Sequence, residues 1–194
     1  MSVEGQRFDL RDITPQPWKN GAGLTREIAI GGADAVDFDW RISVAEVARD
    51  APFSAFPGID RCIVLLRGAG MRLHSHDGSI DHRLATPLTP FHFRGEVALD
   101  ASLIDGASSD FNVMTRRGRY RSELSCHRGA AELHGADATL LFCAEGEWLI
   151  EVGAAQTLSP MQGLLWRTPV GAVRVRPSVE PAALLWVRLC HDRL

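Results

Sequence analysis

The sequence lacks both a long apolar segment and an excess of positive charge. No run among its 194 residues approaches the ~18–20 apolar residues that cross a bilayer, and residues 1–12 contain no apolar signal-peptide core. Lys and Arg total 21 against 24 Asp and Glu, so the net charge of −3 gives no general attraction to polyphosphate. These absences predict a soluble, cytoplasmic protein with neither a membrane nor a nucleic acid as its partner.

Motifs of the common catalytic and metal-binding classes are missing as well. The four cysteines are Cys62, Cys126, Cys143 and Cys190. They are far apart and form no Cys-x-x-Cys pair, which argues against a zinc knuckle or a redox couple. Gly21-x-Gly23 lacks the third glycine of a dinucleotide-binding loop, and neither a Gly-x-Ser-x-Gly elbow nor a Walker loop occurs. The sequence therefore gives no sign of built-in catalytic machinery.

Instead, the chain shows the pattern of short β-strands. Polar and apolar residues alternate at residues 25–30, 39–44 and 172–176. Apolar runs of five residues lie at residues 62–66, 139–143 and 183–187. Alternation is typical of half-buried strands, and such short runs suit buried strands better than helices. Eighteen glycines and ten prolines separate the segments, as in sandwiches and barrels. We therefore predict an all-β fold.

A faint internal repeat predicts two units in the chain. In the first half an apolar strand reaches a turn at Gly68, a second strand follows, and residues 87–90 lead into a third. In the second half the same order passes through Gly146 and residues 158–160. The polar stretch 115–129 is the expected boundary. We assign residues 1–118 to an N-terminal unit and residues 119–194 to a C-terminal unit.

Four stretches together resemble the HutD/Ves family. They are residues 17–27 (PWKNGAGLTRE), 39–43 (DWRIS), 52–61 (PFSAFPGIDR) and 110–116 (DFNVMTR). Their order and spacing agree over residues 8–117, whereas residues 118–194 match only loosely. The resemblance implies a double cupin (bicupin), with two small β-barrel or jelly-roll units. It also implies an association with bacterial histidine utilisation, in which family members sense or buffer a pathway intermediate rather than turn it over.

The first candidate site residues surround a hairpin signal. Asn-Gly favours a tight turn because both residues tolerate positive φ, and this explains Asn20 without any ligand. Thr25 and Glu27 are two residues apart, so they project from one face of a strand. We expect a ligand pocket to be bordered by Trp18, Asn20, Thr25 and Glu27.

Two arginines supply the charge of the expected site. Arg41 and Ser43 share a strand face opposite to an apolar one, so they point either to solvent or into a barrel mouth, and the family resemblance favours the mouth. Arg61 precedes a buried run and is expected at the barrel rim, where the alternative is a surface ion pair worth ~0–1 kcal/mol. Asn112 shares a face with Asp110, and both are expected to fix the rim or to hold the arginines, with Asn112 also a candidate ligand contact.

Together these residues predict non-catalytic binding of a small carboxylate metabolite, without a cofactor and with a regulatory or buffering role. The need for an anion follows from Arg41 and Arg61, since a guanidinium group matches a carboxylate through two parallel hydrogen bonds. The resemblance implies urocanate, formylglutamate or formiminoglutamate as the ligand. The sequence leaves open whether a monomer or a homodimer is the functional unit.

The rival hypothesis is a metal-dependent cupin enzyme, either an oxygenase or an isomerase. His74, His76 and Asp81 are spaced nearly as in the first motif of metal-binding cupins, and they would suit Fe, Mn or Ni. A third histidine should follow after two more strands, about 20 residues or more further on. His92 comes only eleven residues after Asp81. The segment also fits an exposed hairpin that turns at Asp77-Gly78, so we rank the metal-free binder first.

Overall fold

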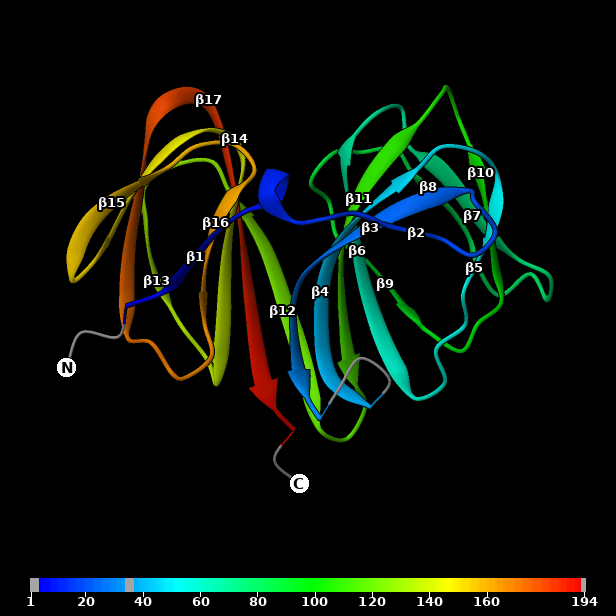
Figure 1. The fold of residues 1–194 in the computed structure, drawn as a ribbon, viewed down its shortest axis with the longest axis horizontal. Coiled ribbons are helices and arrows are strands. Elements are labelled where there is room, and N and C mark those ends of the chain that lie inside the picture. The colour runs from blue at the N-terminus through cyan, green and yellow to red at the C-terminus, as the bar shows by residue number, and fades with distance from the viewer. Residues whose placement is uncertain (1–3, 34–36, 193–194) are drawn as a thin grey trace. The chain divides into compact units, whose positions relative to one another are not determined.

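The computed structural model describes residues 4–33 and 37–192, whose strands form two units (Figure 1). The N-unit comprises residues 13–121, and the C-unit comprises residues 4–12 with residues 122–192. In the described ranges every regular element is a strand except a single 3-10 turn, η1 (Leu10–Asp12), so the all-β prediction is confirmed. No helix in these ranges is long and apolar enough to span a bilayer.

Two antiparallel sheets make up the N-unit. The larger sheet contains, in spatial order, β2 (Gln16–Pro17), β3 (Gly23–Gly32), β4 (Phe38–Val47), β11 (Ser108–Arg116), β6 (Ile59–Arg67) and β9 (Phe91–Arg94). The smaller sheet contains β5 (Ala51–Phe53), β10 (Leu99–Leu103), β7 (Met71–Ser75) and β8 (Asp81–Leu84). No ladder joins the two sheets among the described residues. The strand pairing therefore does not show the closed barrel that the sequence led us to expect.

The hydrophobic core of the N-unit takes side chains from both sheets. Ile63 and Leu65 of β6 pack in one cluster with Met71 and Leu73 of β7 and Leu99 of β10. Because successive side chains of a strand point to opposite faces, the face that carries Ile63 and Leu65 continues to Arg61. The inner face of the larger sheet is thus apolar toward one end and polar toward the other.

The two hairpin turns that Asn-Gly and Asp-Gly predict in the N-unit are present. Gly21 has a φ of 65°, its N–H donates to the Trp18 carbonyl at 2.9 Å, and β2 pairs with β3 on either side. Gly78 has a φ of 71° and donates to the Ser75 carbonyl at 3.1 Å between β7 and β8. The Asn-Gly and Asp-Gly signals therefore predicted these two hairpins correctly.

The C-unit is built on one sheet. Its main path runs from β1 (Gln6–Asp9) through β16 (Gln162–Trp166), β14 (Ala138–Val152) and β17 (Ala172–His191) to β12 (Tyr120–His127). In addition, β13 (Ala131–His134) pairs with β17, and β15 (Ala154–Leu158) pairs with β14. The core of this unit includes Trp148, Trp166 and Trp186.

The first strand of the chain belongs to the C-unit, unlike the division at residue 118 expected from the sequence. Gln6 pairs with Leu165 and Asp9 with Gln162 in the ladder between β1 and β16. The Phe8 ring stacks on Phe142 with centroids 6.4 Å apart. Sequence periodicity reports a strand but not its partner, so it could not reveal this connection.

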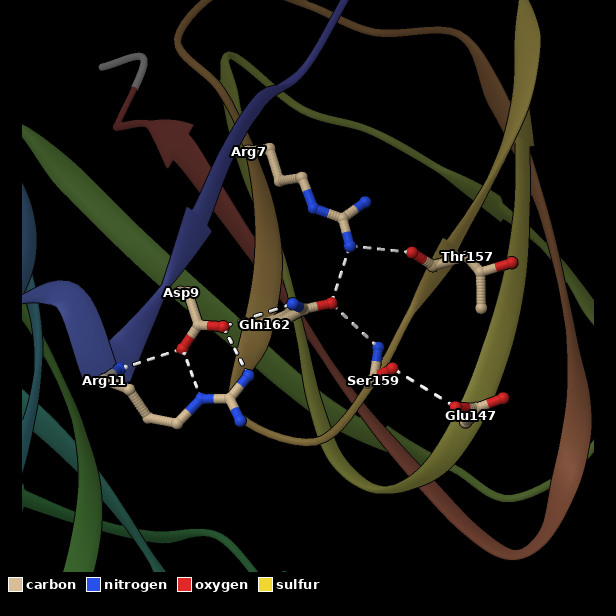
Figure 2. A network of polar contacts seen from close by, with 7 residues as sticks. All are labelled: Arg7, Asp9, Arg11, Glu147, Thr157, Ser159 and Gln162. Carbon is tan, nitrogen blue, oxygen red and sulfur yellow. Dashed lines mark hydrogen bonds and ion pairs between the residues drawn. The ribbon is translucent and has the colours of Figure 1, made fainter.

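A polar network fastens β1 to the C-unit (Figure 2). Gln162 lies at its centre and donates to Asp9 at 3.1 Å, while its own Oε1 accepts from Arg7 at 2.6 Å and from the Ser159 N–H at 3.1 Å. Arg11 holds Asp9 from the other side through a 2.5 Å ion pair. These hydrogen bonds keep the pKa of Asp9 below its usual value.

Gly146 lies inside a strand, whereas the sequence predicted a turn there. β14 runs without a break through 15 residues, and its register against β17 shifts between Cys143 and Trp148. Gly146 has a φ of 72° at this irregularity. A β-bulge of this kind bends a strand without ending it, and glycine suits it because positive φ carries no Cβ clash.

Candidate ligand-binding site

The polar end of the N-unit contains a pocket of about 670 Å³. One wall comes from the hairpin between β2 and β3, another from β5 and the residues after it, and the floor from β3, β4, β11 and β6. The lining residues are Gln16, Pro17, Trp18, Lys19, Asn20, Thr25, Arg41, Ser43, Ala45, Phe53, Ser54, Phe56, Arg61, Asp110, Asn112 and Met114. Seven of the eight expected site residues are among them, and Glu27 is not.

The register of β4, β11 and β6 arranges the floor of the pocket in rows. Residues directly opposite each other on neighbouring strands share a face of the sheet. The arginine row contains Arg41, Met114 and Arg61; the amide row contains Ser43, Asn112 and Ile63; and the acid row contains Ala45, Asp110 and Leu65. Each row is two residues from the next along β11, which corresponds to about 7 Å. Two cations therefore flank one strand at one end of the floor, and a carboxyl group lies at the other end.

Arg61 is buried, yet no carboxylate among the described residues forms an ion pair with it. The residue is only 7% exposed. Three rings surround the guanidinium carbon, with centroid distances of 4.9 Å to Phe93, 5.3 Å to Phe53 and 5.6 Å to Phe56. Burial lowers the pKa of Arg61 to about 10, so the group still carries its charge at neutral pH. The aromatic rings hold this cation in place and leave it available to an anion.

Asp110 and Asn112 bring buried acceptor atoms to the same pocket. They are 1% and 7% exposed. Both carboxyl oxygens of Asp110 and the Oδ1 of Asn112 have no hydrogen-bond partner within the part of the chain that the structure describes. Burial raises the pKa of Asp110 to about 7, although the positive charge of Arg61 acts in the opposite direction. The sequence had suggested that these side chains hold the arginines by hydrogen bonds, but these acceptor atoms make no such bonds.

Arg41 differs from Arg61 in having a carboxylate partner. Its Nε donates to Glu27 Oε2 at 2.7 Å, and both side chains are partly exposed. Glu27 therefore partly offsets the charge of Arg41 from outside the pocket lining. Of the two alternatives for the polar face of β4, the structure shows the one in which Arg41 and Ser43 line the pocket.

The hairpin wall is fixed by hydrogen bonds of its own. Trp18 Nε1 donates to Thr25 Oγ1 at 2.7 Å, and the indole meets the Phe53 ring edge to face at 6.1 Å. Asn20 Oδ1 accepts from the Ala22 N–H at 3.0 Å, which stabilises the turn. Thr25 thus orients Trp18, and Trp18 connects the hairpin to the rings around Arg61.

Two of the three residues of the rival metal site take part in other contacts, whereas His74 Nδ1 is buried without a hydrogen-bond partner among the described residues. Asp81 forms an ion pair with Arg72 at 2.6 Å, and His76 lies 2.8 Å from Asp100. Across residues 4–33 and 37–192, no group of three or more His, Cys, Asp or Glu side chains is arranged to hold a metal ion. The structure therefore offers no support for a metal centre at His74, His76 and Asp81.

Sequence reasoning missed the aromatic rings around Arg61 and underrated Asp110. Phe53 and Phe56 lie in one of the stretches that carried the family resemblance, and this was the available signal for them. Phe93 is directly opposite Arg61 in the ladder between β6 and β9, which only the strand pairing reveals. Side-chain alternation in the sequence already put Asp110 on the same strand face as Asn112. Only the packed structure shows that the carboxyl oxygens of Asp110 have no hydrogen-bond partner among the described residues.

The fold and the pocket define a cupin-like, all-β protein with a buried cation at its site. A protein from Leptotrichia buccalis described as a cupin 2 conserved barrel domain protein superposes with a TM-score of 0.61 at 10% identity, over 96% of this chain and 97% of that chain. At this identity the likeness shows the fold alone. The chain belongs to the HutD family, whose model matches residues 10–185.

Relatives at higher identity agree with this assignment. Protein Ves of Escherichia fergusonii is 36% identical over 160 residues, which are 82% of this chain and 81% of that protein. A Pseudomonas putida protein from the hutC 3' region is 37% identical over 155 residues, 77% and 78% of the two chains. HutD from Pseudomonas fluorescens, solved in a formate condition, superposes with a TM-score of 0.84 at 29% identity, over 97% of this chain and 99% of that chain. The predicted family is confirmed, and its members are linked to a histidine-utilisation gene region.

Proposed function

We propose that the N-unit pocket binds a small carboxylate metabolite of histidine degradation and does not turn it over. Urocanate, formylglutamate and formiminoglutamate are the ligands that we expect, in a regulatory or buffering role. The hutC-region relative supports this pathway, and the charge of the pocket supports an anion. Arg61 and Lys19 line the pocket together with Arg41, whose charge Glu27 offsets only in part.

The observation that carries the proposal is the burial of Arg61 without an ion-pair partner among the described residues. A buried charge is normally paired, because an unpaired one loses its hydration without compensation. Arg61 is buried among phenylalanine rings, faces a pocket and has no ion-pair partner among the described residues. A ligand carboxylate would supply the missing partner and would gain two parallel hydrogen bonds in a partly desolvated site.

Isothermal titration of the wild type and of Arg61→Ala with urocanate, N-formylglutamate and formiminoglutamate tests this proposal. One charge-assisted hydrogen bond contributes ~1.5–3 kcal/mol. Losing Arg61 should therefore weaken binding roughly tenfold to a hundredfold. Thr25→Val should weaken it less, because Thr25 acts mainly on the position of Trp18.

Arg94→Ala is the matched control, since this exposed arginine lies on neighbouring β9 and does not line the pocket. It should bind as the wild type does. Arg61→Lys keeps the charge without the planar fork and should fall between the two. Unchanged binding by a folded Arg61→Ala protein would refute the site. NMR of each ligand left with the protein should show no chemical conversion, and a product would favour an enzyme instead.

We also propose that the chain is a bicupin, with one cupin-type unit in each half. The cupin from Leptotrichia buccalis matches nearly the whole chain, and both units consist of antiparallel strands. In a crystal structure, β6 and β7, which flank Gly68, should then superpose on the two parts of β14 that meet at Gly146. A C-unit whose strands follow another order in space would rule this out.

A further inference from the structure

The unpartnered acceptors and the cations of the pocket lie in different rows of its floor. Arg41 and Arg61 are both opposite Met114, while Asn112 and Asp110 follow two and four residues earlier on β11. All five side chains line the pocket. With a strand rise of about 3.3 Å per residue, the Cα atoms of the amide and acid rows lie about 7 and 13 Å from the arginine row. Arg61 and Asp110 nevertheless shift each other's pKa, so the arginine side chain spans part of this distance, and a ligand that contacted both groups would need only a few bonds between its two ends.

With Asp110 ionised, the buried polar atoms of the amide and acid rows that lack a partner are all acceptors. Asp110 Oδ1, Asp110 Oδ2 and Asn112 Oδ1 lack partners among the described residues. Buried polar atoms in native proteins are almost always hydrogen-bonded, so three unpartnered acceptors that line one pocket point to donors supplied from outside the chain. A simple carboxylate has no such donor once it is ionised. The arginine row alone therefore does not account for this pocket.

The Asp110 side chain can accept hydrogen bonds in either protonation state. Ionised, it offers two oxygens; protonated, it still keeps acceptor capacity. Ser43, the neighbour of Asn112 in the amide row, is 2% exposed and adds a hydroxyl group that can donate or accept. With Asp110 ionised, the acid-row end of the pocket therefore suits a neutral or cationic N–H group better than a second anion.

We infer that the ligand of this pocket has two unlike ends: a carboxylate bound by Arg61 and Arg41, and an N–H donor group received by Asp110 and Asn112. This inference rests on the proposed function, because it takes the arginine row as the carboxylate site. It excludes carboxylates that lack a donor at the far end, and it favours amide, amidine or azole carboxylates.

Matched ligands separate the two ends experimentally. trans-Urocanate is compared by isothermal titration with trans-3-(3-furyl)acrylate, which has a similar shape and carboxylate but no N–H. N-Formylglutamate is compared with glutarate, which lacks the amide. For the wild type we expect the donor-bearing member of a pair to bind at least tenfold more tightly. Equal affinities within both pairs would overturn the inference and leave the carboxylate proposal standing.

Asp110→Leu then identifies the group that receives the N–H. The leucine is similar in size and apolar, so it removes the acceptors without opening a large cavity. The preference for urocanate over furylacrylate should fall to about twofold or less, with furylacrylate binding nearly unchanged. Asp105→Leu, at an exposed acidic residue that does not line the pocket, is the matched control and should keep the preference.

Two further results would count against the inference. If a folded Asp110→Leu protein keeps the full preference, Asp110 does not receive the donor. If the wild type binds no member of either pair, the proposed function fails and this inference fails with it. Thermal unfolding monitors the fold of each variant. Should Asp110→Leu not fold, Asp110→Asn replaces it, keeps one oxygen, and should reduce the preference in part.

Discussion

At the scale of single residues, Asp110 couples the pocket to pH. Its pKa is about 7 in the folded protein against 3.8 for the ordinary group. Between about pH 4 and 7 the folded state therefore holds a proton that the unfolded state has released. Stability rises with pH only where the unfolded state binds more protons, so here the free energy of unfolding falls as pH rises through this window. Three pH units would correspond to at most about 4 kcal/mol.

We expect Asp110→Asn to lack this fall, which urea denaturation at pH 5 and pH 8 would measure. Hydrogen bonds from their partners lower the pKa of other carboxylates, such as Asp77 and Glu96. These groups are present in both proteins, so their contributions to the pH dependence cancel when the variant is compared with the wild type. Exposed Asp105 supplies the control variant Asp105→Asn, which should behave as the wild type does. An identical pH slope in Asp110→Asn and the wild type would show that Asp110 does not titrate in this window.

Part of this site could be predicted from the sequence at the level of single residues. Side-chain alternation put Arg41 on a polar strand face, and the family resemblance directed that face to a pocket, where the structure has it. The rings around Arg61 could not be found in the same way. Phe93 follows Arg61 by 32 residues in the sequence, and only the pairing of β6 with β9 makes them neighbours.

At the scale of secondary-structure elements, Gly146 is the position most sensitive to a larger side chain in β14. A Cβ at this residue would lie 2.4 Å from the Val179 carbonyl oxygen and 2.6 Å from that of Pro181, and neither backbone atom can move away freely. Gly106 has a similar φ of 69° but open space around it. Gly106→Ala should therefore lower the free energy of unfolding by about 1 kcal/mol through φ strain alone, and Gly146→Ala by at least twice as much.

Urea denaturation followed by tryptophan fluorescence would measure both variants. The two glycines have similar positive φ values, so φ strain should cost both variants about the same. The difference between their losses in unfolding free energy therefore measures the effect of the close backbone atoms around Gly146. Equal losses would mean that the bulge in β14 adapts to a methyl group, and the tight packing of this bulge would then not hold in solution.

Predictions at this scale were right about the type of element and wrong about its extent. All six segments predicted from alternation or apolar runs lie within strands. Yet β14 and β17 span 15 and 20 residues, far beyond the five-residue runs that revealed them. Gly146, Pro177 and Pro181 look like strand ends in the sequence. A bulge lets the paired strands continue past such residues, and the partner strand that makes this possible is not visible in local sequence.

At the scale of the whole molecule, the ladder between β1 and β16 makes a specific prediction. Phe8→Ala removes the ring that stacks on Phe142 and should weaken the C-unit by about 2 kcal/mol. Hydrogen exchange should then become faster in β1, β16 and β14, while β4 and β11 of the N-unit stay protected. We expect these three strands to respond together because they belong to one sheet, although β1 is far from β14 and β16 in the sequence.

Phe91→Ala is the complementary control. Phe91 stacks on Phe93 and packs against the core of the N-unit. Its loss should speed exchange in β6 and β9 and leave β16 unaffected. If Phe8→Ala instead loosened β4 and β11 and spared β16, the assignment of β1 to the C-unit would be wrong.

The same ladder constrains the order in which the protein can fold during synthesis. Gln6 pairs with Leu165, so β1 leaves the ribosome 159 residues ahead of its partner strand, or roughly 10 to 30 s earlier at ordinary translation rates. Every ladder of the N-unit lies within residues 16–116, and these are available well before β16 emerges. The N-unit, with its binding pocket, can therefore fold first. The unit that contains the first strand to be made is the last one that can be completed.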